Sequence, residues 1–197
     1  MTNSPPTKLI RVVGQDPSLR NWGLAYGIYD LEAKKLTITK LALLNPVLPD
    51  GKQVRQNSKE IESGTQLYRG AKDATKDAHA TFVEVPVGSQ SARAMCGYGV
   101  CTGVLGAIRA EGIPFFELTP TEIKLAGHGT KTATKKQMID WAMAKHPEAN
   151  WPMYKRKGQM LVCEADAEHM ADAVAAIYAG LACTAFQQTL SFLTANL

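Results

Sequence analysis

Three acidic residues in this sequence interrupt apolar surroundings. Asp16 follows a short β-rich run, Glu84 lies inside another, and Asp172 lies in an alanine-rich stretch with His169 one helical turn before it. Residues spaced i,i+3 on a helix face the same way. If the first two runs are neighbouring strands, a helix packed at their shared end brings three carboxylates and an imidazole together.

Such a cluster favours a divalent cation, because close carboxylates repel each other and raise one another's pKa. Mg²⁺ prefers oxygen ligands and also binds phosphate oxygens. Two such ions roughly 3.5–4 Å apart stabilise the attacking and leaving oxygens of a phosphodiester. The residues therefore predict Mg²⁺-assisted phosphodiester hydrolysis. Mn²⁺ is an expected substitute, since the neutral imidazole of His169 suits it better.

Each acidic residue also has a simpler explanation when taken alone. An aspartate before a proline, as in Asp16-Pro17, is typical of a turn. Glu84 could be exposed on an edge strand, and Asp172 could lie on a solvated helix face. Only their combination indicates a site.

The elements that must position these residues follow from apolar periodicity. Short connections between the first three strands predict an antiparallel meander. Thr119-Pro120-Thr121-Glu122 carries a capping residue, a proline and a glutamate that together predict a helix start. Residues 149–161 are expected to be irregular. We expect strands over 9–13, 22–29, 35–43, 81–85 and 114–118, and helices over 59–79, 91–110 (buried), 134–145 and 165–182, with a C-terminal helix after them.

The order of these elements predicts an α/β protein with a mixed sheet flanked by helices. The 197 residues fit one domain, with 1–7 as a disordered tail and 150–162 as an inserted basic and aromatic loop. The four cysteines lack zinc spacing and are expected to be buried free thiols in a reducing compartment. His79 and His146 are expected on the surface.

The polar, proline-rich start does not have the pattern of a signal peptide, and no apolar run approaches the roughly 20 residues of a membrane span. We therefore expect a cytoplasmic protein, in a host cell if the chain is of phage origin, without a membrane partner or a small-molecule cofactor. The net charge of +4 is too small to indicate nucleic-acid binding alone.

Clustered basic residues carry that argument instead. Residues 123–139 contain no acidic side chain. Clustered lysines beside glycine loops suit phosphate contact. An ordinary solvated helix face is the alternative. Trp151 and Tyr154 either stack on unpaired bases or belong to a surface loop with Trp151 in the core. The expected DNA-binding residues are Arg93, Lys124, Lys131, Lys135, Lys136, Lys155, Arg156 and Lys157.

Residues 14–23, Gly-Gln-Asp-Pro-Ser-Leu-Arg-Asn-Trp-Gly, resemble the opening motif of RuvC-type Holliday junction resolvases. Later segments are similar to further motifs of that family in the same order, so that the resemblance covers residues 8–182. The later motifs lie at 82–84 with 91–94, at 119–137, and at 169–173.

This resemblance implies an RNase H-like fold, with a five-stranded mixed sheet whose first three strands are antiparallel. It implies a homodimeric crossover junction endodeoxyribonuclease that acts on branched DNA. The 91–110 helix and the helix before it are candidate dimer surface. It assigns Asp16, Glu84, His169 and Asp172 to the catalytic metal, and Lys124 and Lys135 to phosphate near the cleavage site.

The chain also departs from the family pattern. Ser18 replaces a usual glycine, and Gln15 is polar where an apolar residue is common. Val87 falls where cellular members carry an aromatic side chain that inserts at the junction. These departures, with the 150–162 insertion, suggest a phage-type or otherwise divergent member. The alternatives are a non-cleaving junction-binding protein on the same fold and a nuclease for another substrate such as an RNA–DNA hybrid.

Overall fold

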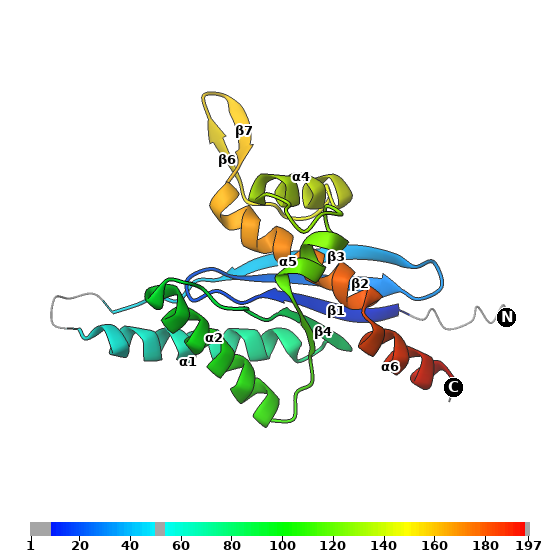
Figure 1. Ribbon diagram of the computed structural model, residues 1–197. Coiled ribbons are helices and arrows are strands. Elements are labelled where there is room, and N and C mark those ends of the chain that lie inside the picture. The colour runs from blue at the N-terminus through cyan, green and yellow to red at the C-terminus, as the bar shows by residue number, and fades with distance from the viewer. Residues whose placement is uncertain (1–8, 50–53, 196–197) are drawn as a thin grey trace.

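The computed structural model describes residues 9–49 and 54–195, so the tail expected at 1–7 lies outside the described residues. A five-stranded mixed sheet forms the centre of the molecule, in the order β3-β2-β1-β4-β5 (Figure 1). The first three strands are antiparallel, and β4 and β5 continue the sheet in parallel, which confirms the predicted meander and mixed sheet. The strands are β1 (Leu9–Asp16), β2 (Trp22–Asp30), β3 (Lys35–Leu44), β4 (Ala80–Glu84) and β5 (Phe116–Leu118).

Strand β1 is three residues longer than predicted, because it is paired on both sides. It pairs with β2 as far as Asp16 and with β4 as far as Gln15, which lies opposite Val83. Asp16 and Glu84 are the next residues on these two parallel strands. Parallel strands end at the same edge of a sheet, so both carboxylates reach one edge, as expected.

Helices cover both faces of the sheet (Figure 1). Helices α1 and α2 lie on one face, while α5 crosses the other face with α3 and α4 beside it. Two apolar clusters fill the two interfaces. The helices are α1 (Gln56–Thr75), α2 (Ala92–Ala110), α3 (Pro120–Ala126), α4 (Lys135–Lys145), α5 (Glu164–Ala182) and α6 (Thr184–Ala195).

Helix α5 packs directly on β1 and β2 because both partners present small residues. Its centre is rich in fully buried alanines. On the sheet side, a Cβ added to Gly14 would lie 2.0 Å from the backbone oxygen of Ala173, and one added to Gly23 would lie 2.1 Å from that of His169. Two glycines of the 14–23 motif therefore allow α5 to approach the sheet.

The polar Gln15 of that motif has partners in the core. It is 1% exposed, its side-chain oxygen accepts a hydrogen bond from the indole of Trp22 at 3.0 Å, and its amide donates to the backbone of Ala71 at 3.5 Å. Buried polar groups are tolerated where they are hydrogen-bonded. The pair with Trp22 explains how a glutamine replaces an apolar residue here.

Helix α2 is not the buried helix that its small and apolar residues predicted. Four of its residues, Cys101, Val104, Leu105 and Ile108, are buried, and most of its first half is exposed. The buried residues share one stripe that faces the sheet and α1, while glycines and other small residues cover the outer side. Composition alone did not distinguish one buried stripe from a fully buried helix.

An inserted loop was predicted at 150–162, but the structure shows a β-hairpin there. It consists of β6 (Met153–Arg156) and β7 (Gln159–Val162). The turn residues Lys157 and Gly158 have φ values of 49° and 81°. Two positive φ values in a two-residue turn match the twist of paired strands.

Two further expectations about burial were wrong in part. The four cysteines are free, as expected, but only Cys101 is buried, and Cys96 is exposed. His79 is exposed, whereas His146 is 2% exposed because it lies at the end of α4 against Tyr178 of α5. Among the described residues, no single helix is long and apolar enough to cross a membrane; one bent pair, α5 with α6 to Phe192, passes by length and composition only.

Candidate active site at the ends of β1 and β4

Asp16 and His169 form the centre of the candidate site. Asp16 is 8% exposed at the end of β1, and its Oδ2 accepts a hydrogen bond from Nδ1 of His169 at 2.6 Å. His169 comes from the second turn of α5, which lies against β1 and β2. The predicted convergence of strand and helix is therefore present.

Glu84 shares this environment from the adjacent strand. Burial, followed by the nearby charges of Asp16 and Asp172, raises the pKa of Glu84 to about 9, while Lys124 acts in the opposite direction. Carboxylates influence one another in this way only when they are close and partly shielded from water. The three predicted carboxylates therefore form one electrostatic cluster.

Asp172 lies one turn beyond His169 on α5. Burial, followed by the charges of Asp16 and Glu168, raises its pKa to about 7 against the opposing effects of His169 and Lys124. Asp172 therefore does not lie on a solvated helix face, the simpler explanation for this residue. Its carboxyl faces the same cluster as the two sheet residues.

The imidazole of His169 responds to the same charges in the opposite sense. Burial by itself lowers its pKa, but the hydrogen bond to Asp16 and the neighbouring carboxylates outweigh that effect and raise it. Without a cation, the protonated imidazole is thus favoured beside Asp16. A metal that bound here would compete with that proton.

The donor set of this cluster fits a divalent cation in its chemistry. Three carboxyl groups and an imidazole from β1, β4 and α5 share one half-buried space, and their mutual repulsion is the kind that a hard cation relieves. Within residues 9–49 and 54–195, however, no three His, Cys, Asp or Glu side chains are grouped closely enough to hold an ion as they stand. Closure around an ion would require these side chains to move together.

Glu84 should make the metal-free protein less stable at neutral and alkaline pH. Its pKa is about 9 in the folded state and near 4.5 when unfolded, so the folded state binds more protons between these values. The stability that this group contributes is present below pH 4.5 and is lost as the pH rises toward 9. We expect the melting temperature in EDTA to fall over this window, and to fall less in Glu84→Gln.

Differential scanning calorimetry of both proteins from pH 5 to pH 9 measures this effect. Glu62→Gln is the control, because Glu62 lies on α1, which covers the opposite face of the sheet from α5. Equal slopes for wild type and Glu84→Gln would contradict the electrostatic account of the cluster.

Two of the predicted lysines lie close to the carboxylates. Lys124 on α3 is half-buried and lowers the pKa of both Glu84 and Asp172. Lys135 is the first residue of α4, and its pKa is raised by a hydrogen bond to Glu168 and by the charges of Asp172 and Asp16. These are the two lysines that the resemblance assigned to phosphate near the cleavage site.

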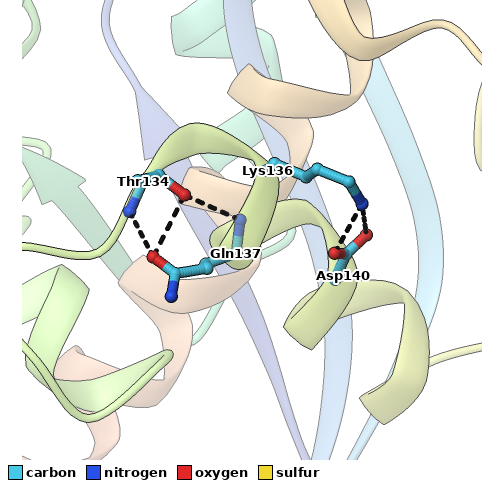
Figure 2. A network of polar contacts seen from close by, with 4 residues as sticks. All are labelled: Thr134, Lys136, Gln137 and Asp140. Atoms are coloured by element: carbon cyan, nitrogen blue, oxygen red, sulfur yellow. Dashed lines mark hydrogen bonds and ion pairs between the residues drawn. The ribbon is translucent and has the colours of Figure 1, made fainter.

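A capping box fixes the start of α4 and hence the position of Lys135. The side chains of Thr134 and Gln137 exchange hydrogen bonds with each other's backbone (Figure 2). Lys136 is held by Asp140 at 2.7 and 2.9 Å (Figure 2). The charge of Lys136 is thus paired within α4, on its exposed side, whereas Lys135 pairs with Glu168 of α5.

Glu168 is a site residue that the sequence interpretation missed. Its Oε1 lies 2.5 Å from Nζ of Lys135, and its charge raises the pKa of both His169 and Asp172. A signal was present, because Glu168 and Asp172 are spaced i,i+4 and so share a helix face. It is a fourth carboxylate at the rim of the cluster.

The remaining predicted DNA-binding residues lie outside the carboxylate cluster. Arg93 lines a groove of about 410 Å³ with Arg20, beside the segment that follows Asp16. Lys131 is exposed between α3 and α4, and Lys155, Arg156 and Lys157 are exposed on the β6–β7 hairpin.

The aromatic residues near the hairpin have different environments. Trp151 is 8% exposed and belongs to the core, which settles the alternative left open for it, whereas Tyr154 is 43% exposed. Val87 is 74% exposed after β4. An exposed aromatic side chain is thus found on the hairpin.

No protein-family model matches the chain. It is 31% identical over 129 residues to crossover junction endodeoxyribonuclease RuvC of Anaeromyxobacter dehalogenans strain 2CP-C, an alignment that spans 65% of this chain and 65% of that protein. It is 32% identical over 130 residues to the RuvC of Anaeromyxobacter sp. strain Fw109-5, over 64% of this chain and 58% of that protein. The chain thus matches about 65% of the length of the first of these relatives.

Two solved structures share the fold. Thermus thermophilus RuvC superposes with a TM-score of 0.61 at 17% identity, covering 92% of this chain and 97% of that one. The structure of T. thermophilus RuvC in complex with Holliday junction substrate gives a TM-score of 0.61 at 16% identity, over 92% and 96% of the two chains. This likeness confirms the expected RNase H-like fold.

Proposed function

We propose, on the premise that this chain is a divergent relative of the RuvC-type Holliday junction resolvases, that it is a structure-selective endodeoxyribonuclease. Its substrate is branched DNA, with the four-way junction as the leading case, and its cofactor is Mg²⁺, for which Mn²⁺ can substitute. The observation that carries the proposal is the cluster of three carboxyl groups and an imidazole at one sheet edge.

The proposed metal ligands are Asp16, Glu84 and Asp172, with His169 as a fourth ligand or as the group that orients the attacking water. Bound divalent ions supply charge stabilisation for the attacking and leaving oxygens of the phosphodiester. When the new bond from the water oxygen to phosphorus forms and the ester bond breaks, a proton must leave the water. In the metal-loaded site, where bound cations would favour the neutral imidazole, His169 would accept this proton while its Nδ1 stays hydrogen-bonded to Asp16.

The lysines beside the cluster would hold the scissile phosphate. Lys124 and Lys135 approach the carboxylates from α3 and α4. A phosphate bound at the metal site would therefore lie beside both ammonium groups. The other proposed DNA contacts are Arg93, Lys131, Lys136, Lys155, Arg156 and Lys157, which are exposed and would contribute sequence-independent affinity.

A homodimer is part of the proposal, because symmetric cleavage of a four-way junction requires two active sites. The exposed outer side of α2 and the adjoining groove along α1, which includes the 72% exposed Ile61, form the proposed contact surface. A two-fold dimer buries the same patch of both copies.

A substrate panel tests the proposed function. We expect the wild type to nick opposed strands of mobile and fixed four-way junctions with Mg²⁺ or Mn²⁺, and to do so at least about tenfold faster than linear duplex or RNA–DNA hybrid. EDTA should abolish the reaction. Binding without cleavage in either metal would favour the non-cleaving alternative, and preferred cleavage of the hybrid would favour the other nuclease.

A further inference from the structure

The β6–β7 hairpin projects from the body of the protein as an arm (Figure 1). It exposes large apolar side chains on both strands. Met153 and Tyr154 are 42% and 43% exposed, and Met160 and Leu161 are 59% and 37% exposed. Side chains of this kind are not expected to point into water on a segment whose only role is to connect two helices.

The base of this arm is fixed to the body. The side chain of Asn150 hydrogen-bonds to both backbone groups of Leu41 on β3, at 2.7 and 2.9 Å. The buried Trp151 donates from its indole to the residue that caps α4, at 2.8 Å. Cys163 donates its backbone N–H to Pro152 at 2.7 Å, which closes the base of the hairpin. The arm is therefore a positioned element.

The strand register divides the arm into two faces. Opposed residues of an antiparallel pair lie on the same face, and successive pairs alternate. Tyr154 and Leu161 are opposed near the base, and Arg156 lies on their face toward the tip. The other face carries Met153, Lys155 and Met160.

The charge of the arm indicates what it binds. Residues 150–163 contain Lys155, Arg156 and Lys157 and no acidic residue. A cationic tip next to an aromatic and aliphatic face complements phosphates and exposed base faces, and base–aromatic stacking is tolerant of sequence. A polyanion with accessible bases fits both halves of this surface.

The arm also lies close to the candidate active site along the chain. Strand β7 ends at Val162, α5 begins at Glu164, and His169 follows five residues later. At a rise of about 1.5 Å per residue, the helix start is roughly 8 Å from His169 along the helix axis. DNA held at the catalytic cluster would thus be within reach of the arm.

We propose that the arm grips the branch point of the DNA, with Tyr154 and Leu161 against base faces exposed where strands separate and Arg156 on an adjacent phosphate. The inference rests on the proposed function and adds the part of the substrate that the arm recognises. Linear duplex offers stacked, covered bases, so the contact is specific for branched DNA.

The test is the double variant Tyr154→Ser/Leu161→Ser. Fluorescence anisotropy at fixed salt should show an affinity for a four-way junction lowered by about tenfold or more, with duplex affinity changed less than twofold. A 2-aminopurine placed at the branch point should be quenched or enhanced by the wild type and not by the double variant.

The matched control is Met153→Ser/Met160→Ser, which changes the opposite face of the same arm and should leave the junction-to-duplex affinity ratio within twofold of wild type. Circular dichroism verifies that each variant is folded. The inference is overturned if the Tyr154→Ser/Leu161→Ser protein keeps the junction-to-duplex affinity ratio of the wild type. It is also overturned if the double variant changes only the self-association of the protein. Junction cleavage by the wild type is measured in parallel. If the wild type cleaves the junction, the proposed function holds even when this inference fails.

Discussion

Replacing Asp16 by asparagine is expected to lower the rate of junction cleavage by at least about 10³-fold, which corresponds to roughly 4 kcal/mol of transition-state stabilisation. Asp16 is the residue whose charge reaches both Glu84 and Asp172, and it holds His169 at 2.6 Å. An asparagine oxygen can still accept that hydrogen bond, so the change removes charge while keeping the contact. Single-turnover cleavage with Mg²⁺ measures the effect.

Junction binding should survive this substitution, because the proposed DNA contacts are basic residues on other elements. We expect the dissociation constant of Asp16→Asn for a junction to stay within about threefold of wild type. Asp77→Asn, on an exposed residue before β4, is the control and should cleave normally. If Asp16→Asn nicks the junction at the wild-type rate, the assignment of the site is wrong.

Replacing Gly23 by alanine is expected to damage both stability and cleavage. Its Cβ would lie 2.1 Å from the backbone oxygen and 2.6 Å from the backbone carbon of His169. Because both atoms belong to a helix backbone, α5 has to move away from β2. Overpacking of this kind costs roughly 1–3 kcal/mol or more, or several degrees in melting temperature, and it should displace His169 from Asp16.

Thermal unfolding and single-turnover cleavage of Gly23→Ala together measure this prediction. Gly14→Ala should behave in the same way, since its Cβ would meet the backbone oxygen of Ala173 at 2.0 Å. Gly99→Ala on α2 is the matched control for thermal unfolding, because a Cβ there meets nothing within 4 Å and alanine favours a helix. A Gly23→Ala protein with wild-type melting and cleavage would refute the close-packing argument.

Local patterns were sufficient for most elements, because alternation and caps act over a few residues. The capping box at Thr119 and the strand that carries Glu84 were found in this way. The same patterns failed where long-range pairing decided the outcome. Strand β1 continues through Gly14 because two neighbours bond to it, and His146 is buried because Tyr178, 32 residues away, bonds to it at 3.0 Å.

The sequence by itself determined which donor groups are available and in what order they occur. Asp16 after the first strand, Glu84 on the fourth, and His169 with Asp172 on one helix face follow from residue types and short-range spacing. Their meeting could be expected only through the resemblance or by assuming that β1 and β4 are neighbours. The tertiary structure decided that assumption by pairing the two strands in parallel.

Only the tertiary structure decided how the site is assembled around Asp16. It brought His169, 153 residues away, within 2.6 Å, and it placed Glu168 beside Lys135 at the rim. It also showed that Gly14 and Gly23 allow the close approach of α5, and that residues 153–162 form a projecting hairpin. The physical reason is that local spacing fixes which face of a helix or strand a residue occupies, whereas the distance between two faces depends on packing of the whole chain.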